Sequence, residues 1–157
     1  MTRTFSSLLI LCLALSLPAQ AAKPKTCFSK AEMNAERLVR QGLRLREGAK
    51  GCDGDPWNFQ TQAQWEDIDK RFGPQFAAQT KIRRGAFVRE FDKEADYRIN
   101  ESDGRIVMLY RGYPLSAPYC TEIKKLLTDM QKSGWVAFTK KANTAPDEVK
   151  FVYRACN

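Results

Sequence analysis

Apolar residues recur at intervals of three and four along residues 30–48, and polar residues fill the positions between them. Such spacing is typical of an amphipathic helix. Ser29 and Glu32 form a capping box at its beginning, and Gly48 and Gly51 are stop signals at its end. We therefore expect a helix over 30–48. Its apolar face consists of Ala31, Ala35, Leu38, Gly42, Leu45 and Ala49.

Two further segments show helical spacing. The first is interrupted by Gly73 and Pro74, so it predicts short helices over 62–80. The second ends at Gly134 and predicts a helix over 117–133. The apolar side of this last helix consists of Tyr119, Ile123, Leu126, Leu127 and Met130.

Elsewhere aromatic and β-branched residues come close to alternating with polar ones, which is typical of strands. A Ser-Asp-Gly turn signal predicts a β-hairpin over 96–110, and a second hairpin is expected over 135–155. Residues 84–95 fit either a strand or a helix, because Glu, Lys and Ala interrupt the alternation. The order of elements predicts an α+β fold, in which an antiparallel sheet has helices packed against one face.

The chain begins with a segment that resembles a secretory leader. Arg3 precedes an apolar run over 8–17, which is too short to span a bilayer, and Ala19-Gln20-Ala21 follows as a cleavage signal. We expect a signal peptide over 1–21 and one exported, soluble domain over 22–157, located in the periplasm or secreted. No second apolar run is long enough for a transmembrane anchor.

Four cysteines remain after the leader, and an even number in an exported domain predicts two disulfides. Cys27 and Cys52 flank the first predicted helix, which would hold them roughly 30 Å apart. A disulfide requires a much shorter separation. Antiparallel packing of the two long helices gives Cys52–Cys120 with Cys27–Cys156, which we prefer. Parallel packing gives Cys27–Cys120 with Cys52–Cys156.

The composition is basic, with 26 Lys and Arg against 18 Asp and Glu, and the formal net charge is +8. Such a surface favours anionic partners, either an envelope protein or an anionic envelope component. The chain has no histidine, which excludes His-dependent nucleophile triads and removes the commonest general base and zinc ligand. We expect no cofactor and no metal, and we favour a binding protein over an enzyme.

Two groups of side chains are candidates for binding. One is a basic stripe on the first predicted helix, which either grips anionic groups or forms a solvated helix face. It consists of Arg37, Arg40 and Arg44. The other is a set of aromatic and arginine side chains on the predicted sheet, suited to stacking on bases or sugars. It consists of Tyr97, Arg98, Arg105, Tyr110, Arg111 and Tyr113. Export and the absence of an RNP-like run disfavour nucleic acid.

Acidic residues provide two further candidate sites with weaker support, a calcium-binding loop and a pair of catalytic carboxylates. Asp53-Gly54-Asp55 has the composition of a calcium loop, but its spacing is not that of an EF-hand. A glycoside hydrolase would need two converging carboxylates. The carboxylates available for such a pair are Glu66, Asp67, Glu90 and Glu94.

Size, export and the absence of catalytic motifs together favour a small, disulfide-stabilised protein that works by binding. In its sharpest form this is an inhibitor or immunity-type protein that acts on an envelope partner. The alternatives are a carboxylate-dependent periplasmic hydrolase and a basic protein that binds anionic envelope polymers. No pattern in the sequence indicates an oligomeric state.

Overall fold

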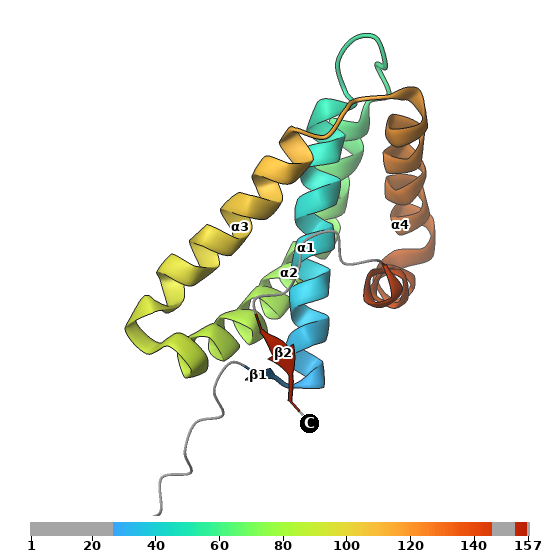
Figure 1. Ribbon diagram of the computed structural model, residues 1–157. Helices are drawn as coiled ribbons and strands as arrows, with labels where there is room; N and C mark the ends of the chain where they lie inside the picture. Colours follow the sequence, from blue (N-terminus) through green and yellow to red (C-terminus); the bar gives the residue numbers. More distant parts are fainter. Residues whose placement is uncertain (1–26, 146–152, 157) are drawn as a thin grey trace, which may run out of the picture.

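The computed structural model describes residues 27–145 and 153–156, and this part of the chain is mostly helical (Figure 1). Its elements in chain order are β1 (Cys27–Phe28), α1 (Lys30–Gly51), α2 (Thr61–Phe91), the 3₁₀ helix η1 (Asp92–Glu94), α3 (Ala95–Arg111), α4 (Ala117–Thr144) and β2 (Arg154–Ala155). The prediction of an α+β fold is therefore wrong. In the described residues, the sheet consists of two short strands that run parallel.

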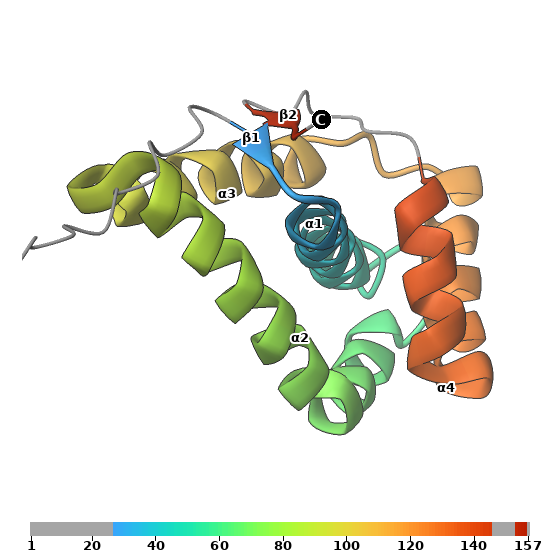
Figure 2. The ribbon, with the colours of Figure 1, turned by 90° about the horizontal axis from the view of Figure 1, so that it is seen from below.

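Helix α1 lies among the other helices, and α2, α3 and α4 are arranged around it (Figure 2). Neighbours on several sides bury polar as well as apolar residues of α1. Glu36 is completely buried, and Arg40 and Glu47 are only 6% and 4% exposed. The helix is therefore the centre of the bundle, and its charged side chains must find partners inside the protein.

The predicted beginning of α1 is confirmed. The Ser29 hydroxyl accepts from the Glu32 N–H (3.4 Å), and the Glu32 carboxylate accepts from the Ser29 N–H (2.7 Å), which completes the capping box. At the other end the helix continues to Gly51, past the expected end at residue 48. It closes there because the Cys52 N–H donates to the Gly48 carbonyl (2.9 Å).

Helix α3 occupies the residues predicted to form the hairpin over 96–110. Its buried residues recur at helical intervals: Ala95, Ser102, Ile106 and Tyr110. Met108, which alternation assigns to the same face as Ile106, is 67% exposed. The turn signal lies inside the helix, where Asp103 contacts Arg83 of α2 (2.6 Å). A short apolar run is compatible with the strand period of two residues and with the helical period of 3.6 residues. Packing against α1 and α2 stabilises the helix here.

The hairpin predicted over 135–155 is also wrong. Residues 135–144 continue α4 as a helix, in which Trp135 and Phe138 both pack on Phe76 of α2 (ring centroids 4.9 and 5.7 Å apart). Two aromatic rings three residues apart can share one partner only on a helix face. Residues 146–152 lie outside the described residues, and β2 pairs in parallel with β1.

Helix α2 is one long helix where short helices over 62–80 were expected. Pro74 lies inside it, and the helix axis changes direction along its length (Figure 2). Proline lacks the N–H that would bond to the preceding turn, so it bends a helix that tertiary packing keeps continuous. For residues 84–95 the helical alternative is the correct one as far as Phe91, after which η1 leads into α3.

Helix α4 contains a sharp break at Gly134, whose φ of 74° and ψ of −171° are non-helical. We call residues 117–133 the first arm and residues 135–144 the second arm. Figure 1 shows the first arm from the side and the second arm almost end-on, so the two arms run in different directions. The helix predicted over 117–133 is confirmed as the first arm, with Gly134 as its end.

Two apolar cores stabilise the bundle, and each has a disulfide beside it. The larger core lies between α1, α2 and α4, and it includes both members of the Cys52–Cys120 disulfide. In the smaller core, Phe28 stacks on Tyr153 (3.7 Å between ring centroids) next to the Cys27–Cys156 disulfide. These are the two pairs that antiparallel packing of the long helices favours.

The predicted leader over 1–21 lies outside the described residues. Among the described helices, none combines the length and the apolarity that crossing a bilayer requires. The two disulfides fit the oxidising conditions of a secreted or periplasmic location.

Candidate functional site

The aromatic and arginine candidates lie on α3 and the loop after it, where a sheet had been expected. Tyr97 is 65% exposed, whereas Tyr110 is buried in the bundle at 5%. Arg98 contacts Glu94 and Glu101 of neighbouring turns (3.0 and 3.6 Å). The set therefore does not converge on one binding surface.

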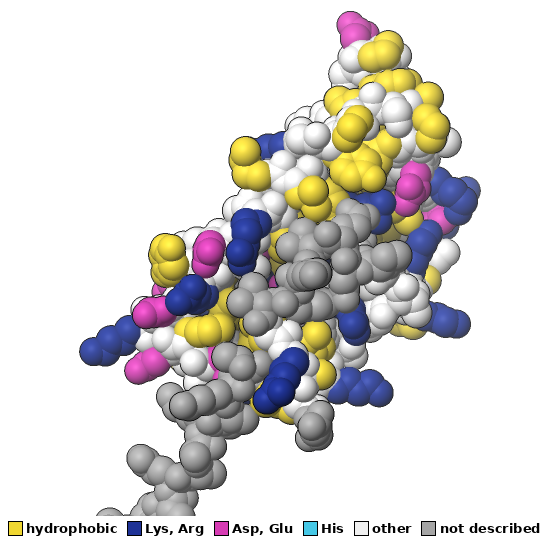
Figure 3. Space-filling model, in the orientation of Figure 1, with side chains coloured by type: hydrophobic (Ala, Val, Ile, Leu, Met, Phe, Trp, Pro, Cys, Tyr) yellow, Lys and Arg dark blue, Asp and Glu magenta, His cyan; other side chains and the backbone are white. Residues whose placement is uncertain are grey.

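The two remaining arginines of this set also have acidic partners. Arg105 contacts Glu101 (3.7 Å), and Arg111 reaches across to the buried Glu47 of α1 (2.8 Å). On the face of the molecule seen in Figure 3, Lys and Arg side chains stand apart from one another with acidic and apolar groups between them. The described residues form no continuous basic patch on this face. Apolar side chains gather instead toward its upper end.

The basic stripe of α1 is largely covered by neighbouring elements, because its helix lies inside the bundle. Arg40 Nε donates to Glu36 Oε1 (2.7 Å), and both side chains are buried. The Arg44 side chain is 13% exposed and contacts Glu122 of α4 (3.1 Å). Arg37, the third member, is half-buried. Arg44 therefore connects α1 to α4, whereas Arg40 is paired within α1.

Glu36 is the centre of a buried charge network. It receives hydrogen bonds from Arg40 and from Arg83 of α2, and Arg83 in turn forms two hydrogen bonds with Asp103 (2.6 and 3.0 Å). Burial by itself lowers the pKa of Arg83, but the charges of Glu36 and Asp103 outweigh burial and raise it. Burial and the charge of Glu36 raise the pKa of Tyr153. Glu36, Arg40 and Arg83 are buried, and the Asp103 side chain is 31% exposed. Because the charges compensate one another, we interpret the network as structural.

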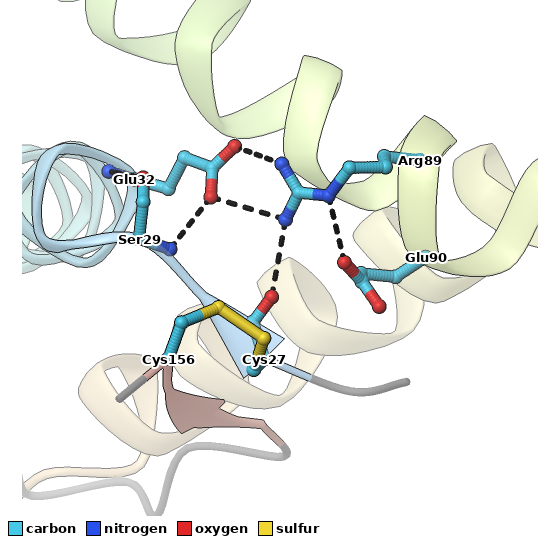
Figure 4. Close-up of a disulfide and its surroundings, with 6 residues drawn as sticks. All are labelled: Cys27, Ser29, Glu32, Arg89, Glu90 and Cys156. Carbon is cyan, nitrogen blue, oxygen red and sulfur yellow. Dashed lines mark hydrogen bonds and ion pairs between the residues drawn. A yellow bond between two sulfur atoms is a disulfide. The ribbon is translucent and has the colours of Figure 1, made fainter. Parts of the chain in front are cut away.

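A second charge network fastens the beginning of the described chain (Figure 4). Arg89 of α2 donates to both carboxylate oxygens of Glu32, to the Cys27 carbonyl (3.1 Å) and to Glu90 (2.8 Å). Burial by itself raises the pKa of Glu32, but the hydrogen bonds from Arg89 and Ser29 hold it below its ordinary value. This network is also structural, because each of its polar groups already has a partner.

The carboxylates proposed for hydrolysis lie at opposite ends of α2. Glu66 and Asp67 are in its first turns, and Glu90 and Glu94 are at its far end and in η1. Glu66 and Glu90 are about 24 helical residues apart, which corresponds to roughly 36 Å measured along the bent axis of α2. Two catalytic carboxylates would have to lie within about 10 Å of each other. The fold therefore does not bring a carboxylate of one group to a carboxylate of the other.

The acidic loop after α1 has a structural use. Asp53 accepts from the Gln62 N–H at the beginning of α2 (3.0 Å), and Asp55 accepts from the Asn58 side chain (2.6 Å). In residues 27–145 and 153–156, no three His, Cys, Asp or Glu side chains are grouped as a metal site would require. Asp53 and Asp55 therefore satisfy loop and helix-start donors.

A groove between α1 and the two arms of α4 is the feature best suited to a ligand. Its volume is about 590 Å³, within the range typical of small-molecule sites. The groove exists because the break at Gly134 turns the second arm away from the direction of the first. Its apolar lining consists of Leu45, Leu126, Met130, Ala137, Phe138, Ala142 and Ala145.

Aromatic side chains of α2 and α4 hold the second arm in place. Trp135 and Phe138 pack against Phe76 of α2, and Phe76 lies directly over Gly42 of α1. A Cβ at residue 42 would come within 2.8 Å of the Phe76 ring. Gly42 therefore allows the close approach that anchors the arm, which gives a physical reason for a glycine in the middle of a helix.

Charged residues of both signs stand at the edge of the groove. Arg44 contacts Glu122 across the α1–α4 boundary (3.1 Å), and Asp129 contacts both Lys125 (2.7 Å) and Lys141 (3.7 Å). The hydrogen bond from Lys125 lowers the pKa of Asp129, and the charges of both lysines contribute. An apolar lining with a charged edge suits a ligand that is apolar at one end and polar at the other.

The sequence prediction missed most of this groove. Arg44 is the one predicted binding residue that lines it, and the other predicted residues lie elsewhere or are paired in the interior. Gly134 was interpreted as the end of a helix, and the helical second arm beyond it was interpreted as a strand. The signal that could have found the groove is the aromatic pair at 135 and 138, whose three-residue spacing is helical.

Searches for related proteins give no further guide to function. No family model, no curated protein and no solved structure matches this chain.

Proposed function

We propose that this protein is a small, disulfide-braced binding protein of the cell envelope or the secreted fraction, and that the α1–α4 groove receives an apolar group of its partner. The single observation that carries the proposal is the apolar groove that the Gly134 break opens between α1 and the arms of α4. The disulfides support the location, since such bonds persist outside the reducing cytoplasm.

The distribution of ionisable groups supports binding in preference to catalysis. The buried carboxylates Glu36 and Glu47 are paired with arginines, and neither lines the groove. At the groove itself, Glu122 and Asp129 have basic partners. A general base would need a lone pair directed at a bound substrate, whereas these carboxylates are occupied with ion pairs.

The proposal is tested with a neutral apolar fluorophore, N-phenyl-1-naphthylamine, titrated into the purified protein. We expect saturable binding with a rise in fluorescence. Ala137→Trp places an indole in the groove lining and should weaken binding by at least tenfold, because the new side chain fills the space that the probe needs. Far-UV circular dichroism and the thermal midpoint establish that the variant is folded.

Val136→Trp is the matched control. Val136 is the neighbouring residue, is 82% exposed and does not line the groove. The same new side chain at this position should leave probe binding unchanged. Absence of saturable binding to the wild type, or equal binding by Ala137→Trp and the wild type, would overturn the proposal.

A further inference from the structure

In the part of the chain that the structure describes, cations and carboxylates lie together at the edge of the groove. Among the described residues whose ion pairs border it, three cations face two carboxylates. Glu122 is matched by Arg44 (3.1 Å), whereas Asp129 is shared by Lys125 and Lys141. Two ammonium groups of the described residues therefore share one carboxylate at this edge, next to an apolar lining.

The two lysines hold Asp129 unequally. Lys125 Nζ lies 2.7 Å from Asp129 Oδ2, a normal charge-assisted hydrogen bond, whereas Lys141 Nζ lies 3.7 Å from the same oxygen. Lys125 alone therefore supplies the short hydrogen bond. Lys141 lines the groove, its side chain is 56% exposed, and an ammonium group has three N–H donors. It can turn to another anion while Asp129 keeps its short partner.

We propose that the groove binds a single-chain fatty acid, with the alkyl chain on the apolar lining and the carboxylate at the Lys141 ammonium. The inference rests on the proposed function of the groove and adds the chemical class of its occupant. Charge complementarity supports an anionic head over a neutral or cationic one. The volume of about 590 Å³ suits one alkyl chain better than a two-chain phospholipid.

The test measures displacement of N-phenyl-1-naphthylamine from the groove by three ligands with the same chain: decanoate, 1-decanol and decylammonium. Decanoate should displace the probe at about tenfold lower concentration than decanol, which corresponds to one charge-assisted hydrogen bond. Decylammonium should be weakest. Lys141→Gln should remove the preference for decanoate over decanol, whereas Lys141→Arg should retain most of that preference.

Lys132→Gln is the control for a general loss of positive charge, because Lys132 is an exposed lysine of the first arm that does not line the groove. It should leave the preference for decanoate intact. The preference should also weaken as salt is added, as expected for a half-exposed ion pair.

The outcomes separate this inference from the proposed function. The assignment of a fatty acid is wrong if the probe binds but decanol competes as well as decanoate, or if Lys141→Gln retains the preference for decanoate. In either case the groove remains a binding site. Binding to anionic phospholipid vesicles with no displacement by decanoate would also overturn the fatty acid. Failure of the probe and all three ligands to bind would overturn both.

Discussion

Several arginines that the sequence offers as ligands for anions already have carboxylate partners inside the protein. Arg40 contacts Glu36 in the interior, and Arg111 contacts the buried Glu47. A guanidinium in such a pair would have to exchange one hydrogen bond for another in order to bind a second anion, so its net gain would be small. Pairing leaves the formal net charge of +8 unchanged, but it decides which arginines are available to a ligand, and the net charge alone does not contain that information.

Glu47 provides a test of this pairing through the pH dependence of stability. Burial by itself raises its pKa, but the hydrogen bonds and charges of Arg111 and Arg46 outweigh burial and hold the pKa below the ordinary 4.5. Because the pKa is lower in the folded state, the carboxylate stabilises the fold above pH 4.5. This contribution is lost as pH falls through the folded-state pKa.

We expect urea unfolding to show a smaller loss of stability on acidification for Glu47→Gln than for the wild type. The free energy of unfolding is compared between neutral pH and about pH 3, where most of the pH-dependent stabilisation by carboxylates is lost. The control is Glu101→Gln, which removes a half-exposed carboxylate from α3 and should retain the acid dependence of the wild type. An identical loss for Glu47→Gln and the wild type would contradict the assigned role of Glu47.

At the scale of elements, the beginning of α1 and the break in α4 were easier to predict than whether a segment is helix or strand. The capping box of α1 and the break at Gly134 depend on residues within a few positions, so they were correctly located from the sequence. Residues 96–110 are different, because Ile106, Met108 and Tyr110 alternate like a strand while Ile106 and Tyr110 also share a helix face. Contact with α1 and α2 favours the helix, in which Ile106 and Tyr110 are both buried.

Gly134 should be the residue on which the shape of α4 depends. Its φ of 74° with ψ of −171° lies in a region that is essentially restricted to glycine. Gly134→Ala should therefore cost about 1–3 kcal/mol of stability, as strained backbone does. The new methyl meets no atom within 4 Å, so crowding makes no contribution. Urea unfolding measures the loss, and probe binding reports whether the groove survives.

Gly104→Ala is the matched control, because Gly104 also has open space around its Cβ position but lies in regular α3. Alanine favours helix over glycine by up to about 1 kcal/mol, so this variant should be more stable than the wild type. If the two variants changed stability in the same direction, backbone conformation at Gly134 would not be the cause.

At the scale of the whole molecule, the two disulfides close loops of very different length. The sequence separations are 129 residues for Cys27–Cys156 and 68 for Cys52–Cys120. The chain-entropy model gives each bond about 4–5 kcal/mol of stabilisation, with little difference between them. What distinguishes them is their surroundings, since Cys52 and Cys120 are completely buried and Cys156 is exposed.

We expect a mild reductant to open Cys27–Cys156 before Cys52–Cys120, because thiol exchange requires access to a sulfur atom. Timed alkylation followed by peptide mass mapping would show the order. Near-ultraviolet circular dichroism should show that the larger core, which contains Cys52–Cys120, remains packed after the first bond opens. Simultaneous opening of both bonds, or opening of Cys52–Cys120 first, would contradict this expectation.

The sequence by itself determined the local features of this protein. The beginning of α1, the first arm of α4 and the break at Gly134 follow from capping and backbone preferences of a few adjacent residues. For the cysteines, a rigid helix holds Cys27 and Cys52 too far apart to bond with each other, which excludes that pair. The choice between the two remaining pairings depended on how the long helices pack, which the sequence left open.

Only the tertiary structure decided which faces are buried and where the groove lies. Arg40 and Arg44 form a stripe on any helix, but α2, α3 and α4 turn that stripe into interior and boundary ion pairs. Phe76 and Gly42 hold the second arm of α4 from positions far away in the chain. Burial, pairing and concavity are properties of such distant contacts, so a pattern read along the chain does not contain them.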